Sequence, residues 1–82
     1  MANIIYKTDE QGKRLFLWNT TGYFTETGWL RIELTADMVF RRGDYICFGG
    51  EDLSEQDGIY EIVEAHSGIY NVKRINKERF QE

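Results

Sequence analysis

The chain has only one cysteine, Cys47, among its 82 residues. A single cysteine excludes an internal disulfide, which is the usual means of stabilising small secreted domains. The N-terminus also lacks the basic segment and apolar run of a secretory signal, and no stretch approaches the ~20 apolar residues of a transmembrane helix. We therefore expect a cytoplasmic protein that does not engage a membrane.

A strong positive charge is also missing from the sequence. The formal net charge of −4 at pH 7 and the pI of about 5.0 argue against a protein whose main function is to neutralise nucleic-acid phosphates. The charges are unevenly distributed, because residues 51–64 include six acids and no base, whereas bases gather near the C-terminus. We expect a flexible acidic loop over residues 49–58 and a basic C-terminal tail over residues 73–82.

Groups that could perform catalysis are scarce. His66 is the one histidine, and with Cys47 it forms the one conceivable pair of base and nucleophile. Cys47 lies in an apolar run typical of a small buried residue, His66 lies in a segment typical of a solvated turn, and no third orienting group is evident. An EF-hand alignment around Gly58 fails because Leu53 occupies the first ligand position, and zinc would lack ligands. We predict a non-enzymatic protein without a metal or a cofactor.

The length limits the chain to a single hydrophobic core. We expect residues 1–82 to form a single small β domain. A domain of this size buries only about 60% of the surface of its unfolded chain. Five Phe, five Tyr and two Trp offset this limit, because each aromatic side chain buries a large area. The domain should therefore fold alone or as a small oligomer.

Short runs of β-branched and aromatic residues alternate with glycine-containing segments, which is typical of an all-β protein. The runs that we interpret as strands cover residues 3–8, 13–18, 23–25, 29–35, 44–48, 59–64 and 69–74. The glycines of the connections, including residues 19–22, predict turns with positive φ. The integrin-like tripeptide Arg42-Gly43-Asp44 is interpreted as such a turn. Helix is expected only as one turn at residues 35–38 and as a frayed terminal helix at residues 76–81.

Hydrophobic alternation indicates which residues face the core. Leu30, Ile32 and Leu34 alternate with polar residues, as in a strand with one solvated face. The same pattern recurs more loosely at Leu15, Leu17, Tyr70 and Val72. Closure of such strands removes exposed sheet edges. We predict a small antiparallel sheet closed into an SH3-like or OB-like barrel or half-barrel of five to seven short strands.

The last two predicted strands have similar sequences. The segment GIYEIV at residues 58–63 is followed ten residues later by GIYNVK at residues 68–73. Two similar strands this close together predict a hairpin with a four-residue connection, residues 65–68.

Large aromatic residues on a solvated face point to binding. Trp29 is expected to share such a face with Arg31, with Phe16 and Trp18 as further candidates, since aromatic residues are enriched among interface anchors. The acids of the 49–58 loop could steer a basic partner or mimic phosphate charge. These acidic candidates are Glu51, Asp52, Glu55 and Asp57.

Two functions fit these residues. The leading hypothesis is a non-enzymatic protein-binding module whose partner is another protein or a second copy of the chain. The alternative is a small barrel that binds single-stranded nucleic acid by stacking bases on aromatic side chains beside arginines. For that alternative the candidate surface is Phe16, Trp18, Trp29, Arg14, Arg31, Arg41 and Arg42.

The segment Phe40-Arg41-Arg42-Gly43-Asp44-Tyr45-Ile46, together with the hairpin of residues 58–73, resembles small β-barrel proteins of tailed bacteriophages. Some of these proteins close the phage head or join it to the tail. The resemblance implies a non-enzymatic structural component, or an inhibitor of a host machine, in the host cytoplasm or the virion. It also implies assembly into a ring or a heteromeric complex.

Overall fold

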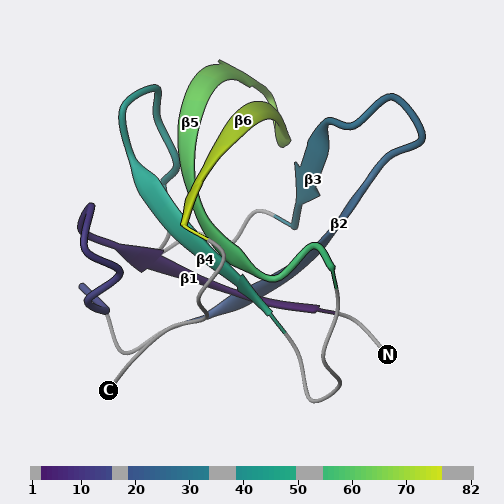
Figure 1. The fold of residues 1–82 in the computed structure, drawn as a ribbon. Coiled ribbons are helices and arrows are strands. Elements are labelled where there is room, and N and C mark those ends of the chain that lie inside the picture. Colours follow the sequence, from purple (N-terminus) through teal and green to yellow (C-terminus); the bar gives the residue numbers. More distant parts are fainter. Residues whose placement is uncertain (1–2, 16–18, 34–38, 50–54, 77–82) are drawn as a thin grey trace.

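A computed structural model describes residues 3–15, 19–33, 39–49 and 55–76 of the chain (Figure 1). These residues form six β-strands and no helix. In chain order the strands are β1 (Asn3–Thr8), β2 (Thr20–Phe24), β3 (Leu30–Ile32), β4 (Tyr45–Gly49), β5 (Gly58–His66) and β6 (Ile69–Asn76). Within these described ranges no helix is long and apolar enough to cross a membrane.

The six strands close into an antiparallel barrel in the order β1-β2-β3-β6-β5-β4. Two three-stranded meanders, β1 to β3 and β4 to β6, are joined through the pairs β1–β4 and β3–β6. In Figure 1 the long strands β5 and β6 curve together, and β3 lies beside β6. The predicted all-β fold and the small closed barrel of five to seven strands are confirmed.

The inward side chains of the barrel form the hydrophobic core. Leu30 and Ile32 are 0% and 2% exposed, whereas Arg31 and Glu33 are exposed, so the predicted alternation is confirmed for residues 30–33. Leu34, the third residue expected to face the core, lies outside the described ranges. Burial of each large aliphatic side chain contributes about 1.5–3 kcal/mol. The buried cluster contains Ile5, Leu30, Ile32, Phe40, Ile46, Phe48, Tyr60, Ile62 and Tyr70, and Phe24 and Val72 pack against it.

A second buried layer lies outside the barrel wall. Cys47 and Ile59 are opposite each other on β4 and β5 and are 2% and 3% exposed, yet neither belongs to the inner cluster. The turn after β1 covers this position, because a Cβ built on Gly12 would lie 2.3 Å from Ile59 Cδ1. Asp9 Oδ1 shapes the turn by accepting hydrogen bonds from two backbone amides beyond it. Cys47 is thus the small buried residue that the sequence indicates.

The expected strand at residues 13–18 is not found in the described part of this segment. Arg14 forms only an isolated bridge with Thr8, and residues 16–18 lie outside the described ranges. Leu15, expected to face the core, is 53% exposed. Its amide donates a hydrogen bond of 3.0 Å to the Lys7 carbonyl, but no strand in the described part of the chain covers its side chain. The expectation for Leu15 is wrong because alternation does not reveal whether a face becomes covered.

Gly22 lies within β2 and not in a turn, so the turn expected at residues 19–22 is wrong. Its neighbours explain the glycine: a Cβ would lie 2.3 Å from the Arg31 carbonyl oxygen and 2.7 Å from Ile5 Cδ1. Gly22 therefore permits a close approach between strands, which is one reason for glycine inside a sheet. Positive φ is confirmed at Gly12, Gly28, Gly43, Gly58 and Gly68.

The predicted hairpin of the last two strands is confirmed, with β5 and β6 antiparallel. Its connection is shorter than expected. Ser67 and Gly68 have φ values of 40° and 90°, both positive as in the I′ turns that join paired strands. Two shifts of register between β5 and β6 accompany the pronounced curvature of the pair.

The basic C-terminal tail expected at residues 73–82 begins inside a strand. Lys73 and Arg74 belong to β6, where Lys73 lies opposite Glu61 and Arg74 opposite Tyr60. The strand predicted at residues 69–74 is therefore confirmed and extends to Asn76, so residues 73–76 continue the β5–β6 pairing. Residues 77–82 lie outside the described ranges, as do both of the short helical turns expected, apart from Asn76.

Candidate functional site

The outer face of β2 and β3 carries two opposed pairs of side chains. Tyr23 and Arg31 are direct cross-strand partners. The Glu33 amide donates a hydrogen bond of 2.9 Å to the Thr21 carbonyl, which places these two residues beside each other in the same way. Tyr23 is 57% exposed, and Arg31 and Glu33 are also exposed. We refer to Thr21, Tyr23, Arg31 and Glu33 as the β2–β3 wall.

Two side chains of the wall have no partner within the described part of the chain. Neither the Tyr23 side chain nor the Arg31 side chain forms a hydrogen bond, an ion pair or a ring contact there. Glu33 accepts a hydrogen bond from Thr21 Oγ1 through Oε2 at 2.9 Å. Arg31 and Glu33 are two residues apart on one face, a rise of about 7 Å. The wall therefore presents an aromatic ring, a cation and an anion to the solvent.

Trp29 extends this wall at the end nearest the β2–β3 turn. Its ring centroid lies 5.7 Å from that of His66, at the end of β5. His66 is the cross-strand partner of Ile69, which in turn is the partner of Arg31. The structure thus brings Trp29 and Arg31 to the same side of the barrel. His66 is solvent-exposed, as expected, but it also packs against Trp29.

Glu64 forms a small polar cluster next to His66. Its Oε1 accepts a hydrogen bond of 3.1 Å from Asn71 Nδ2, and its Oε2 lies 3.3 Å from His66 Nε2. These two hydrogen bonds, together with the charges of His66 and Arg42, lower the pKa of Glu64 below its ordinary value. Glu64 is therefore ionised at neutral pH and places a negative charge next to His66, the residue that packs against Trp29.

We expect the substitution Asn71→Ala to raise the pKa of Glu64 towards its ordinary value, because it removes the largest cause of the shift. A carboxyl whose pKa is depressed by folding stabilises the protein above its unfolded pKa, and this contribution is lost as the pH falls through the folded pKa. The variant should therefore lose less stability on acidification than the wild type. NMR titration of the glutamate side-chain carbons measures the pKa, with Asn19→Ala as an exposed control; an unchanged Glu64 pKa in the Asn71 variant contradicts the assignment.

The described end of the acidic loop is held against the barrel. Arg74 Nη2 donates to the Glu55 carbonyl, and Tyr60 Oη donates to the Gln56 carbonyl at 2.5 Å. Arg74 also donates to Tyr60 Oη, from Nε at 3.1 Å and from Nη2 at 2.9 Å. Asp57 is only 5% exposed. Within the loop expected at residues 49–58, residues 55–57 are thus anchored by hydrogen bonds and include a buried acid, because Arg74 lies in β6 opposite Tyr60.

Four of the residues that the sequence singles out cannot be placed in this site. They are Phe16, Trp18, Glu51 and Asp52, which lie outside the described ranges. Of the other acidic candidates, Glu55 is exposed and Asp57 is buried. A steering or mimicking role for the loop therefore cannot rest on the Asp57 side chain.

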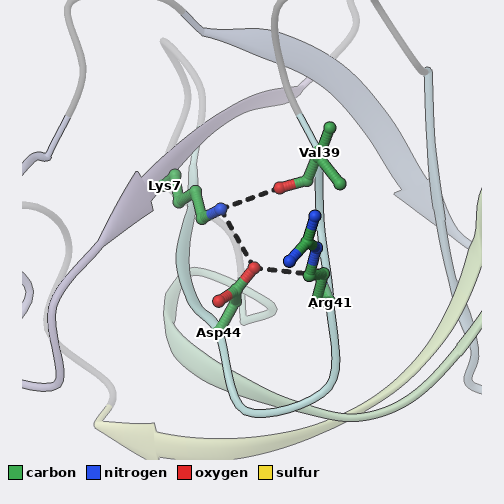
Figure 2. Close-up of polar contacts among 4 residues, drawn as sticks. All are labelled: Lys7, Val39, Arg41 and Asp44. Carbon is green, nitrogen blue, oxygen red and sulfur yellow. Dashed lines mark hydrogen bonds and ion pairs between the residues drawn. The ribbon is translucent and has the colours of Figure 1, made fainter.

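A polar clamp fixes the connection between β3 and β4 (Figure 2). Lys7 Nζ lies 3.0 Å from Asp44 Oδ2 and donates to the Val39 carbonyl at 2.7 Å. The Arg41 amide donates to the same Asp44 oxygen at 2.8 Å. Figure 2 shows the Asp44 carboxylate directed towards Lys7. The clamp commits this carboxylate to the fold, so the tripeptide that ends at Asp44 is a structural turn, as the sequence indicates.

The described residues do not bring Cys47 and His66 together, and they form no cluster of metal ligands. The cross-strand partner of Cys47 is Ile59. His66 lies seven residues further along β5, so Cys47 and His66 do not form a pair. In the described part of the chain no group of three or more His, Cys, Asp or Glu side chains is placed to hold a metal ion. The wall on β2 and β3 is the surface on which exposed aromatic and charged groups come together.

No protein-family model matches this chain, and neither a curated protein nor a solved structure matches it. The function is therefore inferred from the wall itself. The sequence pointed to Trp29 and Arg31 but missed Tyr23 and Glu33. Tyr23 lies between the inward-facing Gly22 and Phe24, and this alternation indicates that its side chain faces outwards. The alternation is missed when residues 19–22 are assigned to a turn.

Proposed function

We propose that this chain is a non-enzymatic protein-binding module and that the β2–β3 wall is its interface. The observation that carries the proposal is the pair Tyr23 and Arg31: they lie opposite each other, they are exposed, and within the described part of the chain their side chains form no hydrogen bond, ion pair or ring contact. Tyrosine and arginine are enriched among the residues that dominate binding energy. Both side chains project from paired strands, so binding costs little backbone conformational entropy.

The surroundings of the wall favour a protein over a nucleic acid. Tyr23 and Trp29 could stack bases, and Arg31 could contact a phosphate, as single-strand binders do. However, Glu33 shares the outer face with Arg31, and the ionised Glu64 lies next to His66, which packs against Trp29. Adjacent carboxylates repel a polyphosphate backbone, whereas a protein partner can match charges of both signs.

Photo-crosslinking tests the interface. A photoreactive phenylalanine analogue at Tyr23 is expected to crosslink a discrete protein in the cells that express the chain. The same analogue at Val39, which is 55% exposed on the clamped β3–β4 connection, is the control and should crosslink little. Arg31→Ala should reduce the crosslink at Tyr23. Equal crosslinking from both positions contradicts the proposed interface.

Fluorescence anisotropy with labelled single strands tests the nucleic-acid alternative. We expect no binding at micromolar protein and low salt. Micromolar binding that weakens with salt and is lost on Trp29→Ala would replace our proposal with the alternative, because phosphate contacts release counterions and their affinity falls steeply with salt.

The resemblance to tailed-phage barrels suggests two finer versions of the proposal. In one, the chain is a structural component that assembles with itself or with other virion proteins; in the other, it inhibits a host machine in the cytoplasm. The identity of the crosslinked protein separates them.

A further inference from the structure

We propose that the partner at the β2–β3 wall is a second copy of this chain, bound in a two-fold symmetric dimer. The inference rests on the proposed function, since it names the occupant of the same surface. It is carried by the arrangement of charge on the wall, which is complementary to itself.

The positions of the wall residues define a two-by-two grid. Tyr23 and Arg31 form one row, and Thr21 and Glu33 form the other. Two copies can face each other across a two-fold axis that lies in the plane of the wall. If this axis runs perpendicular to the strands and passes between the two rows, each row of one copy faces the other row of its partner. This arrangement places Arg31 over Glu33 of the partner subunit and Tyr23 over Thr21 of the partner subunit. Each contact then occurs twice, as an isologous interface requires.

The charges needed for this contact are available in the single chain. Arg31 and Glu33 face the same side, yet no ion pair joins them, and the Arg31 side chain forms no hydrogen bond or ion pair with any described residue. Thr21 occupies only Oε2 of Glu33, which leaves Oε1 to accept a hydrogen bond. A guanidinium and a carboxylate that stay apart within one chain can each meet the opposite charge of a second chain.

The exposed ring supplies the apolar part of the contact. Tyr23 is the most exposed of the large hydrophobic residues in the described part of the chain, at 57%. Packing the ring over a threonine side chain removes apolar area from both copies. Small domains often gain stability through oligomerisation because their own cores are limited.

The expected dimer is weak and sensitive to salt. The wall and its flank at Trp29 provide fewer residues than the ~20 a side of a standard interface. We therefore expect a dissociation constant of about 10–100 µM at low ionic strength. The constant should rise with salt, because the paired charges are only partly buried.

Charge exchange tests the dimer by sedimentation equilibrium between about 5 µM and 1 mM protein, a range chosen to bracket the expected constant. The wild type should approach twice the 9.7 kDa of one chain. Arg31→Glu and Glu33→Arg should each raise the dissociation constant roughly a hundredfold. Mixing these two variants should restore association, because one chain then carries two acids and the other two arginines. Arg41→Glu, an exposed charge reversal on the clamped connection, should leave the constant unchanged, and circular dichroism verifies the fold of every variant.

Three results overturn the inference: a wild type that stays monomeric at 1 mM, a dimer that tolerates both wall variants, or a mixture of the variants that fails to associate. A monomer whose photoreactive Tyr23 position still crosslinks another protein overturns the dimer alone and leaves the proposed function intact. A dimer that survives both variants while the Tyr23 crosslink is absent overturns both.

Discussion

Replacing Gly22 by alanine is expected to lower the free energy of unfolding by about 3 kcal/mol, the upper part of the usual range for overpacking. A Cβ at this position would lie 2.3 Å from the Arg31 carbonyl oxygen and 2.7 Å from Ile5 Cδ1. The first of these atoms belongs to the backbone of β3 and cannot move aside as a side-chain end can. The barrel must therefore separate β2 from β3, which strains the strand pairing on which the wall is built.

Gly28→Ala is the matched control, measured like Gly22→Ala by urea denaturation. Gly28 has a φ of +86° and no atom within 4 Å of a built Cβ, so alanine there adds backbone strain without a clash. This strain costs about 1–2 kcal/mol. Gly22 has no positive φ and should nevertheless be the less tolerant position. A smaller loss for Gly22→Ala than for Gly28→Ala contradicts the close approach of the two strands.

Ile32→Ala should lower the free energy of unfolding by about 2–5 kcal/mol, the usual loss for a buried aliphatic side chain. Ile32 is 2% exposed within the inner cluster, and its neighbours Arg31 and Glu33 point outwards. The substitution therefore empties space inside the barrel and leaves the charges of the wall in place. The backbone hydrogen bond from the Ile32 amide to the Gly68 carbonyl, at 2.9 Å, does not depend on the side chain.

Val39→Ala provides the comparison for Ile32→Ala, since Val39 is 55% exposed and its contact in the clamp uses the carbonyl oxygen. Exposed substitutions of this kind change stability by less than about 0.5 kcal/mol. Urea denaturation of both variants gives the two losses. A loss below that value for Ile32→Ala shows that the inward face of β3 is assigned incorrectly.

The candidate site was predictable only in part. The alternation around Leu30 and Ile32 places Arg31 on the solvated face, and that placement is correct. The opposing residue is not contained in the same stretch of sequence. Tyr23 meets Arg31 because β2 pairs with β3 in one register, and a shift of one residue would turn Tyr23 inwards.

The sequence by itself determined the features that depend on neighbouring residues: the all-β class, the inward face of β3, the hairpin of β5 and β6, and the positive φ of the turn glycines. Local periodicity and turn chemistry suffice for these, because each depends on a few adjacent side chains.

Only the tertiary structure decided the features that depend on residues distant in sequence. Leu15 is exposed because none of the described strands covers it, and Gly22 is required by the approach of β3. Arg74 holds the end of the acidic loop through Tyr60, a residue of β5 that lies 14 positions earlier in the chain. The physical reason is the same in each case. Burial and strand pairing depend on which distant segments come into contact when the barrel closes, and local sequence patterns carry little information about these contacts.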